Sequence, residues 1–127
     1  MSLNPRKTCI IIEDNPAFVK ILEVFIRRLG YLDVVSCHDD SLKSAVSIFR
    51  YKPDLIFLDI SISGLNGLEM METLEYKPKT IVISNHSDEC LDAYSEVRVD
   101  AFMQKPVSFE HFKEVVNSVL TENVPVS

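Results

Sequence analysis

The sequence predicts an α/β fold in which five short strands alternate with five helices around one parallel sheet. The runs 9–12, 55–58 and 81–83 are short, rich in β-branched residues and apolar on both faces, which is typical of strands buried in a parallel sheet. Between the runs, apolar residues recur every three or four positions, which indicates helices. Because parallel strands need crossover connections, the strand–helix order predicts helices on both faces of the sheet.

Composition limits the classes of protein that fit. The 127 residues are 46% hydrophobic and 25% charged, as in an ordinary globular protein, so we expect one domain with its core at about 7–121 and short polar tails. The net charge of −6, without a basic cluster, argues against direct nucleic-acid binding. No apolar run approaches the roughly 18 residues of a membrane span, and the polar start lacks a signal peptide, so a cytoplasmic location is expected.

The first helix has the clearest boundaries. Asn15 can cap its start, Pro16 suits its first position and Gly30 can end it. Its apolar stripe is Phe18, Ile21, Leu22, Phe25, Ile26 and Leu29. The spacing of three and four predicts that this stripe faces the sheet.

The other elements have weaker signals. Residues 34–35 and 101–103 are candidate strands, and Asp39 and Asp40 are candidate caps of a second helix. The stripe expected to face the core in that helix is Leu42, Ala45, Val46 and Phe49. Two short stripes predict the next helices: Leu68, Met71 and Leu74, then Leu91, Tyr94 and Val97. After the cap Ser108, the last helix has the stripe Phe109, Phe112, Val115, Val116, Val119 and Leu120.

Polar residues follow four of the predicted strands. They are the pair Glu13–Asp14, then Asp59, Ser84 and the pair Lys105–Pro106. In open parallel sheets, ligands bind beyond the carboxyl ends of the strands. We therefore expect the three carboxylates to share one pocket, with Ser84 and Lys105 at its rim.

Three neighbouring carboxylates repel one another, and a hard divalent cation with oxygen ligands relieves that repulsion. Mg²⁺ fits because it accepts one or two carboxylates together with phosphate oxygens. The Lys105 ammonium and the Ser84 hydroxyl could bind further anionic oxygens. This combination predicts a site for a phosphoryl group, and an aspartate carboxylate can itself accept such a group.

These residues, in this order, resemble the receiver domain of two-component response regulators. The loop 59–67 also matches that family in length and glycine placement, and the resemblance extends over about 7–121. It implies a doubly wound, flavodoxin-like sheet with the strand order 2-1-3-4-5.

The resemblance also implies a role for each site residue. Asp59 would accept a phosphoryl group from a sensor histidine kinase. The Mg²⁺ ligands would be the side chains of Asp14 and Asp59 and the main-chain carbonyl of Ser61, with Glu13 acting through metal-bound water. Ser84 and Lys105 would bind phosphoryl oxygens.

Other positions would tune or transmit the signal. Phe102 matches the family's aromatic switch residue, and Lys105–Pro106 would be a cis peptide. Ser61 and His86 occupy the positions that tune dephosphorylation. Two residues depart from the common pattern: Ser63 replaces a proline, and Ser84 replaces a threonine but keeps the hydroxyl.

The expected function is therefore signalling rather than catalysis on a substrate. Phosphorylation would switch the surface of the fourth helix, fifth strand and fifth helix, and this face could form a homodimer. One alternative is a degenerate receiver that binds proteins constitutively. Another is a Mg²⁺-dependent phosphatase, although the second aspartate such enzymes need is Ser61 here. The kinase, the output and any continuation beyond Ser127 stay open.

Overall fold

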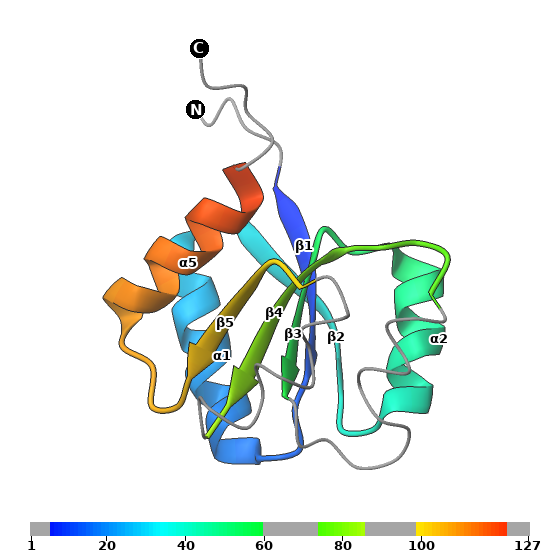
Figure 1. Cartoon of the computed structure of the whole chain (residues 1–127), viewed down its shortest axis with the longest axis horizontal. Helices are drawn as coiled ribbons and strands as arrows, with labels where there is room; N and C mark the ends of the chain where they lie inside the picture. Colours follow the sequence, from blue (N-terminus) through cyan, green and yellow to red (C-terminus); the bar gives the residue numbers. More distant parts are fainter. Residues whose placement is uncertain (1–5, 60–73, 86–98, 122–127) are drawn as a thin grey trace.

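The computed structural model describes residues 6–59, 74–85 and 99–121 and contains one five-stranded parallel sheet. Its strand order is β2-β1-β3-β4-β5, as the resemblance implied (Figure 1). The strands are β1 (Lys7–Ile12), β2 (Leu32–His38), β3 (Leu55–Asp59), β4 (Lys79–Ser84) and β5 (Ala101–Gln104). The expected third and fourth helices fall mainly on 60–73 and 86–98, outside the described residues.

Three helices are described, and they cover both faces of the sheet. These are α1 (Pro16–Leu29), α2 (Ser41–Tyr51) and α5 (Phe109–Thr121). Figure 1 shows α1 and α5 on one side of the sheet and α2 on the other. None of the helices within the described ranges is long and apolar enough to cross a membrane.

The sheet separates two apolar clusters, because alternate side chains of a strand point to opposite faces. The larger cluster joins α1 and α5 to residues such as Ile11, Phe57 and Ile83. The smaller cluster consists of Ile10, Ile12, Ile48, Ile56, Leu58 and Val82. β1 and β3 supply residues to both clusters, which explains why their runs are apolar at every position.

The predicted boundaries of α1 are confirmed. The Asn15 side chain accepts hydrogen bonds from the amides of Ala17 (2.9 Å) and Phe18 (3.3 Å), and Pro16 occupies the first turn. Gly30 ends the helix in the left-handed conformation, with φ of 84°. The buried residues Phe18, Leu22 and Ile26 face the sheet, whereas Ile21, which was expected in the same stripe, is 42% exposed. α1 therefore starts directly beyond the carboxyl end of β1.

α5 packs beside α1 through an aromatic cluster. The ring of Phe112 stacks on Phe57 with centroids 5.5 Å apart and contacts Phe25 at 5.3 Å. The Ser108 hydroxyl accepts a hydrogen bond from the amide of His111 at 3.1 Å, which confirms the predicted cap. Edge-on and offset contacts between rings add stability beyond the area that they bury.

The predicted orientation of α2 is wrong for three of the four residues of its expected stripe, and only Ala45 packs against the core. Leu42, Val46 and Phe49, which we call the α2 stripe, were expected in the core but are 63%, 66% and 70% exposed. The inward face instead carries Ser44, Ser47 and Ile48, all buried.

Hydrogen bonds explain why this orientation is tolerated. The Ser44 hydroxyl donates to the carbonyl of Asp40 (2.7 Å), and the Ser47 hydroxyl lies 2.6 Å from Nε2 of His38. The Asp40 side chain also caps the helix by accepting from the amide of Lys43 at 2.9 Å. Because these buried hydroxyls have partners, the serines can face the sheet at little cost.

The orientation of α2 can be tested by two neighbouring substitutions. Ile48→Ala should lower the free energy of unfolding by about 2–5 kcal/mol, because it opens a cavity in the smaller cluster. Val46→Ala should change it by about 0.5 kcal/mol or less, because this side chain is exposed. Urea unfolding at low protein concentration measures both. A larger loss from Val46→Ala than from Ile48→Ala would show that the stripe is the buried face.

Candidate functional site

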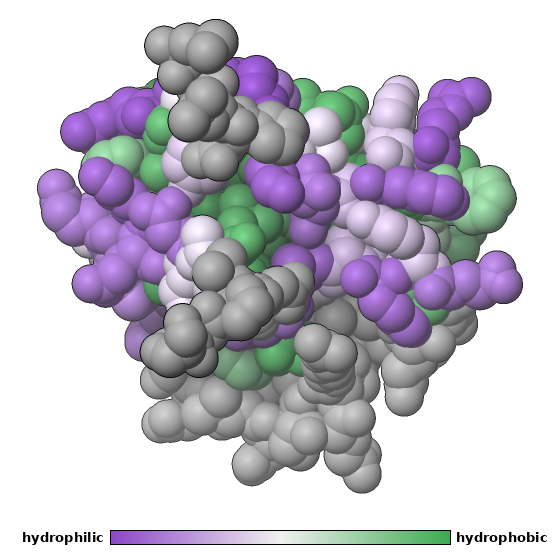
Figure 2. Space-filling view, turned by 90° about the horizontal axis from the view of Figure 1, so that it is seen from above, coloured by the Kyte–Doolittle hydropathy of each residue, from purple (hydrophilic) through white to green (hydrophobic). Residues whose placement is uncertain are grey.

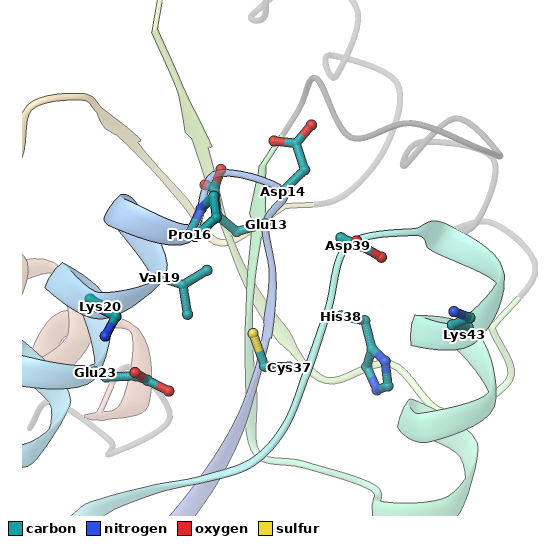
Figure 3. Close-up of a pocket in the computed structure, with 10 residues that line it drawn as sticks. All are labelled: Glu13, Asp14, Pro16, Val19, Lys20, Glu23, Cys37, His38, Asp39 and Lys43. Atoms are coloured by element: carbon teal, nitrogen blue, oxygen red, sulfur yellow. The ribbon is translucent and has the colours of Figure 1, made fainter.

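The acidic residues predicted from the sequence meet at the carboxyl edge of the sheet. Glu13 and Asp14 follow β1, and Asp59 is the last residue of β3. One carboxylate oxygen from each lies within 4.8 Å of the other two. Figure 3 shows Glu13 and Asp14 on the turn between β1 and α1. The adjacent pairing of β1 and β3 thus brings together acids that lie 45 positions apart in the sequence.

The three acids differ in their environments. Glu13 and Asp59 are 3% and 2% exposed, whereas Asp14 is open to solvent. Burial, followed by the proximity of Asp59, raises the pKa of Glu13 to about 7. The amide of Asn15 donates to Oε2 of Glu13 at 3.0 Å, and this bond acts in the opposite direction. The pocket therefore concentrates negative charge that needs a positive partner.

Lys105 supplies part of that positive charge. Its Nζ lies 3.0 Å from Oε1 and 3.1 Å from Oε2 of Glu13, and 3.8 Å from Oδ2 of Asp59. The ammonium also lies 4.5 Å from the centre of the Phe18 ring, a cation–π contact. With a side chain only 13% exposed, Lys105 is held inside the site by two acids and one ring.

The strands beyond β3 position the remaining predicted residues. Asp59 pairs in register with Ile83, so the buried Ser84 lies one residue further along the same edge. The carbonyl of Ser84 accepts a hydrogen bond from the amide of Lys105 at 2.8 Å. The peptide bond between Lys105 and Pro106 is cis, as expected. A main-chain hydrogen bond therefore joins the end of β4 to the turn after β5 at the site.

The structure does not place every predicted residue in the pocket. Phe102 lies on the edge strand β5, in register with Val82, and is 37% exposed. Ser61 and His86 lie outside the described residues. Ser84 is buried rather than at an open rim.

Two supporting residues were not predicted from the sequence. Asn15 was expected only as a helix cap, yet its amide also holds Glu13. Phe18 was expected only as core, yet its ring borders Lys105. The only signal for either was its closeness in sequence to Glu13, which does not reveal where a side chain points.

The donor set fits a hard divalent cation. Within the described ranges, Oε1 of Glu13 is buried and has no hydrogen-bond partner, although it forms the ion pair with Lys105. Carboxylates from Asp14 and Asp59 lie beside it. Mg²⁺ prefers oxygen ligands of this kind and keeps several waters, which the exposed side of the cluster at Asp14 allows.

Comparison with known proteins identifies the family. The sequence model of the response regulator receiver domain matches residues 9–117, which is most of the chain. The chain belongs to the receiver domain family of two-component response regulators. Its fold and its acidic pocket agree with that membership.

A curated relative and two solved structures illustrate the range of similar proteins. The transcriptional regulatory protein BtsR of Escherichia coli is 25% identical over 100 residues, which cover 77% of this chain and 41% of BtsR. A LuxR-family DNA-binding response regulator from Staphylococcus aureus superimposes with a TM-score of 0.81 at 24% identity, over 90% of this receiver and 98% of that chain.

The second structure contains a metal ion. The receiver domain of the sensor histidine kinase PA1611 from Pseudomonas aeruginosa has a TM-score of 0.79 at 16% identity, over 91% of this receiver and 98% of that chain. In that structure a magnesium ion is coordinated in the active site cleft. At 16% to 24% identity, the likeness to these two solved structures shows the fold alone. The chain spans about half or less of the length of the first curated relatives that it matches.

The charge balance of the pocket predicts opposite effects of two substitutions in metal-free buffer. Asp59→Asn should raise the free energy of unfolding by about 1 kcal/mol, or Tm by about 3–6 °C, because it removes one of the crowded charges. Lys105→Met should lower it by up to about 3 kcal/mol, because Glu13 and Asp59 lose their cation. Thermal unfolding in a chelator measures both. If Asp59→Asn destabilised the protein, the carboxylates would not be in repulsive contact.

Proposed function

We propose that this receiver accepts a phosphoryl group on Asp59 from a sensor histidine kinase and uses it as a signal. The observation that carries the proposal is the buried Asp59 carboxylate, which lies 3.8 Å from the ammonium of Lys105 beside two further acids. Such an aspartate can act as a nucleophile whose product is stabilised by a fixed cation.

The transfer exchanges one bond to phosphorus for another. The P–N bond of the donor phosphohistidine breaks and a P–O bond to the Asp59 carboxylate forms, giving an acyl phosphate. The electron pair of the broken bond returns to the imidazole nitrogen. Asp14, Asp59, the carbonyl of Ser61 and, through water, Glu13 would hold Mg²⁺. When bound, the cation neutralises charge on the phosphoryl oxygens and their ligands.

Lys105 is suited to change partners during this transfer. Before phosphorylation its ammonium is paired with Glu13, at 3.0 Å, and lies farther from Asp59. An incoming phosphoryl group would bring oxygens of higher charge to Asp59, and Lys105 would bind one of them. Ser84, at the end of the neighbouring strand, would donate its hydroxyl to another. Holding these groups in advance lowers the cost of reorganisation during the reaction.

The same residues connect the site to a surface. The amide of Lys105 donates a hydrogen bond to the carbonyl of Ser84. A displacement of either residue would therefore shift the main chain at the ends of both β4 and β5. Phe102 lies on β5 and is partly exposed, which suits a side chain with an inward and an outward position. Phosphorylation would bias this pre-existing equilibrium. The face around β5 and α5 would then bind a partner protein or a second receiver, while Ser61 and His86 would tune the lifetime of the signal.

The assignment predicts that Asp59→Asn abolishes phosphorylation by a small phosphodonor such as acetyl phosphate in the presence of Mg²⁺. The amide is not nucleophilic enough to replace the carboxylate. Phosphate-affinity gel electrophoresis measures the modified fraction. Asp33→Asn is the matched control, since Asp33 is an exposed acid paired with Arg6 at 2.7 Å, and it should be modified like wild type.

The metal requirement is tested in the same assay. A chelator should prevent modification of wild type, and Asp14→Asn should slow it at limiting Mg²⁺, because the cluster loses one ligand. Full modification of Asp59→Asn would reject the phosphoacceptor assignment. Modification of wild type in the chelator, at the rate seen with Mg²⁺, would reject the metal site. If wild type is never modified and never binds beryllofluoride, constitutive binding is the better description.

A further inference from the structure

The α2 stripe is an apolar surface that the phosphorylation site does not use. Leu42, Val46 and Phe49 are spaced by four and three residues, so they lie along one side of the helix. All three are more than 60% exposed, whereas Ile21 and Val24 on α1 are 42% and 47% exposed. In Figure 2, hydrophobic atoms reach the surface at the edge of the molecule where α2 lies, beside hydrophilic side chains.

This arrangement is unusual because serines occupy the inward face of the same helix. Ser44 and Ser47 are buried there, and Ile48 is the fully buried apolar residue that anchors α2 to the smaller cluster. The larger apolar side chains of the same helix, Leu42, Val46 and Phe49, face outward instead. A contiguous apolar surface rimmed by charge is typical of a contact site between proteins.

The helix is charged oppositely at its two ends. Asp39 and Asp40 lie at its start, and Arg50 and Lys52 lie at its end. Asp39 and Lys52 are both exposed. The macrodipole of a helix also has opposite ends, so two copies of α2 attract each other best when they run antiparallel.

The stripe and the charges share one centre, between residues 45 and 46. An antiparallel pair with its two-fold axis at that point sets Leu42 opposite Phe49 of the second copy, and Asp39 opposite Lys52 of the second copy. The exposed Val46 lies next to the axis, whereas the half-buried Ala45 packs inward against the smaller cluster. Apolar residues thus oppose apolar residues, and Asp39 and Lys52 form two opposite-charge pairs related by the axis, which is the self-complementarity that an isologous interface requires.

We propose that two copies of this chain associate through antiparallel packing of their α2 helices. The 11 residues of α2 extend over about 16 Å, which is short for a stable interface of at least about 1,000 Å². We therefore expect a weak dimer that forms as the concentration rises. The proposal does not depend on phosphorylation, because neither the stripe nor its flanking charges include a residue of the phosphorylation site.

The first test is sedimentation velocity of the unphosphorylated chain from about 1 µM to about 1 mM. Wild type should shift from monomer toward dimer. Val46→Glu should stay monomeric, because it places two like charges at the axis. Val24→Glu, the matched control on α1, should dimerise like wild type. Circular dichroism establishes that each variant is folded.

A charge exchange tests the antiparallel register and keeps Leu42, Val46 and Phe49 in place. Lys52→Glu also removes the contact of the Lys52 ammonium with the Phe49 ring, which are 4.8 Å apart. Asp39→Lys alone and Lys52→Glu alone should each weaken association about three- to tenfold, because each opposes like charges. The double variant should recover the wild-type association, because each pair is opposite in sign again.

Three results would overturn the proposal. One is a wild type that remains monomeric throughout, which would assign the α2 stripe to a different protein or to another part of a longer chain. The second is a dimer that persists in folded Val46→Glu. The third is a double charge variant that associates no better than the single variants.

Discussion

The acidic edge of this receiver depends on holding like charges together where two of the three carboxylates are buried. Glu13 and Asp59 are almost fully buried, and Asp14 completes the cluster within 4.8 Å. Unpaired buried carboxylates are strongly unfavourable, so the ammonium of Lys105 is as necessary as the acids themselves. Its ion pair with Glu13 compensates the pocket and leaves Asp59 with the more distant contact. A pocket of this kind suits the added cation and the phosphoryl group of the proposed function.

The parallel sheet makes this arrangement possible. β1 and β3 are adjacent, so their carboxyl ends carry the acids to one place, and β4 and β5 add Ser84 and Lys105 from the other side. The helices α1 and α5 cover the larger cluster, where Phe57 and Phe112 stack. The packed core fixes the strand ends, and the turns beyond them carry the residues of the proposed site.

Much of this could be predicted from the sequence, and the failures have a physical cause. The buried runs of β1, β3 and β4 identified the sheet, and the acids at their ends identified the pocket. For α2 the same periodicity argument failed, since a stripe of Leu42, Val46 and Phe49 can pack on a core or on another protein. The hydrogen bonds that let Ser44 and Ser47 face inward involve Asp40 and His38, and no periodicity reveals them. The contacts of Asn15 and Phe18 likewise depend on orientation, which spacing does not determine.

The most direct test of the central claim is to locate the phosphoryl group on the chain. Borohydride reduces an aspartyl phosphate to homoserine, so the phosphorylated protein can be reduced, digested and sequenced by mass spectrometry. Our account predicts homoserine at position 59 and aspartate at positions 14, 33 and 54. Reduction at Asp14 with Asp59 unchanged, or a stable phosphate on a histidine, would contradict it.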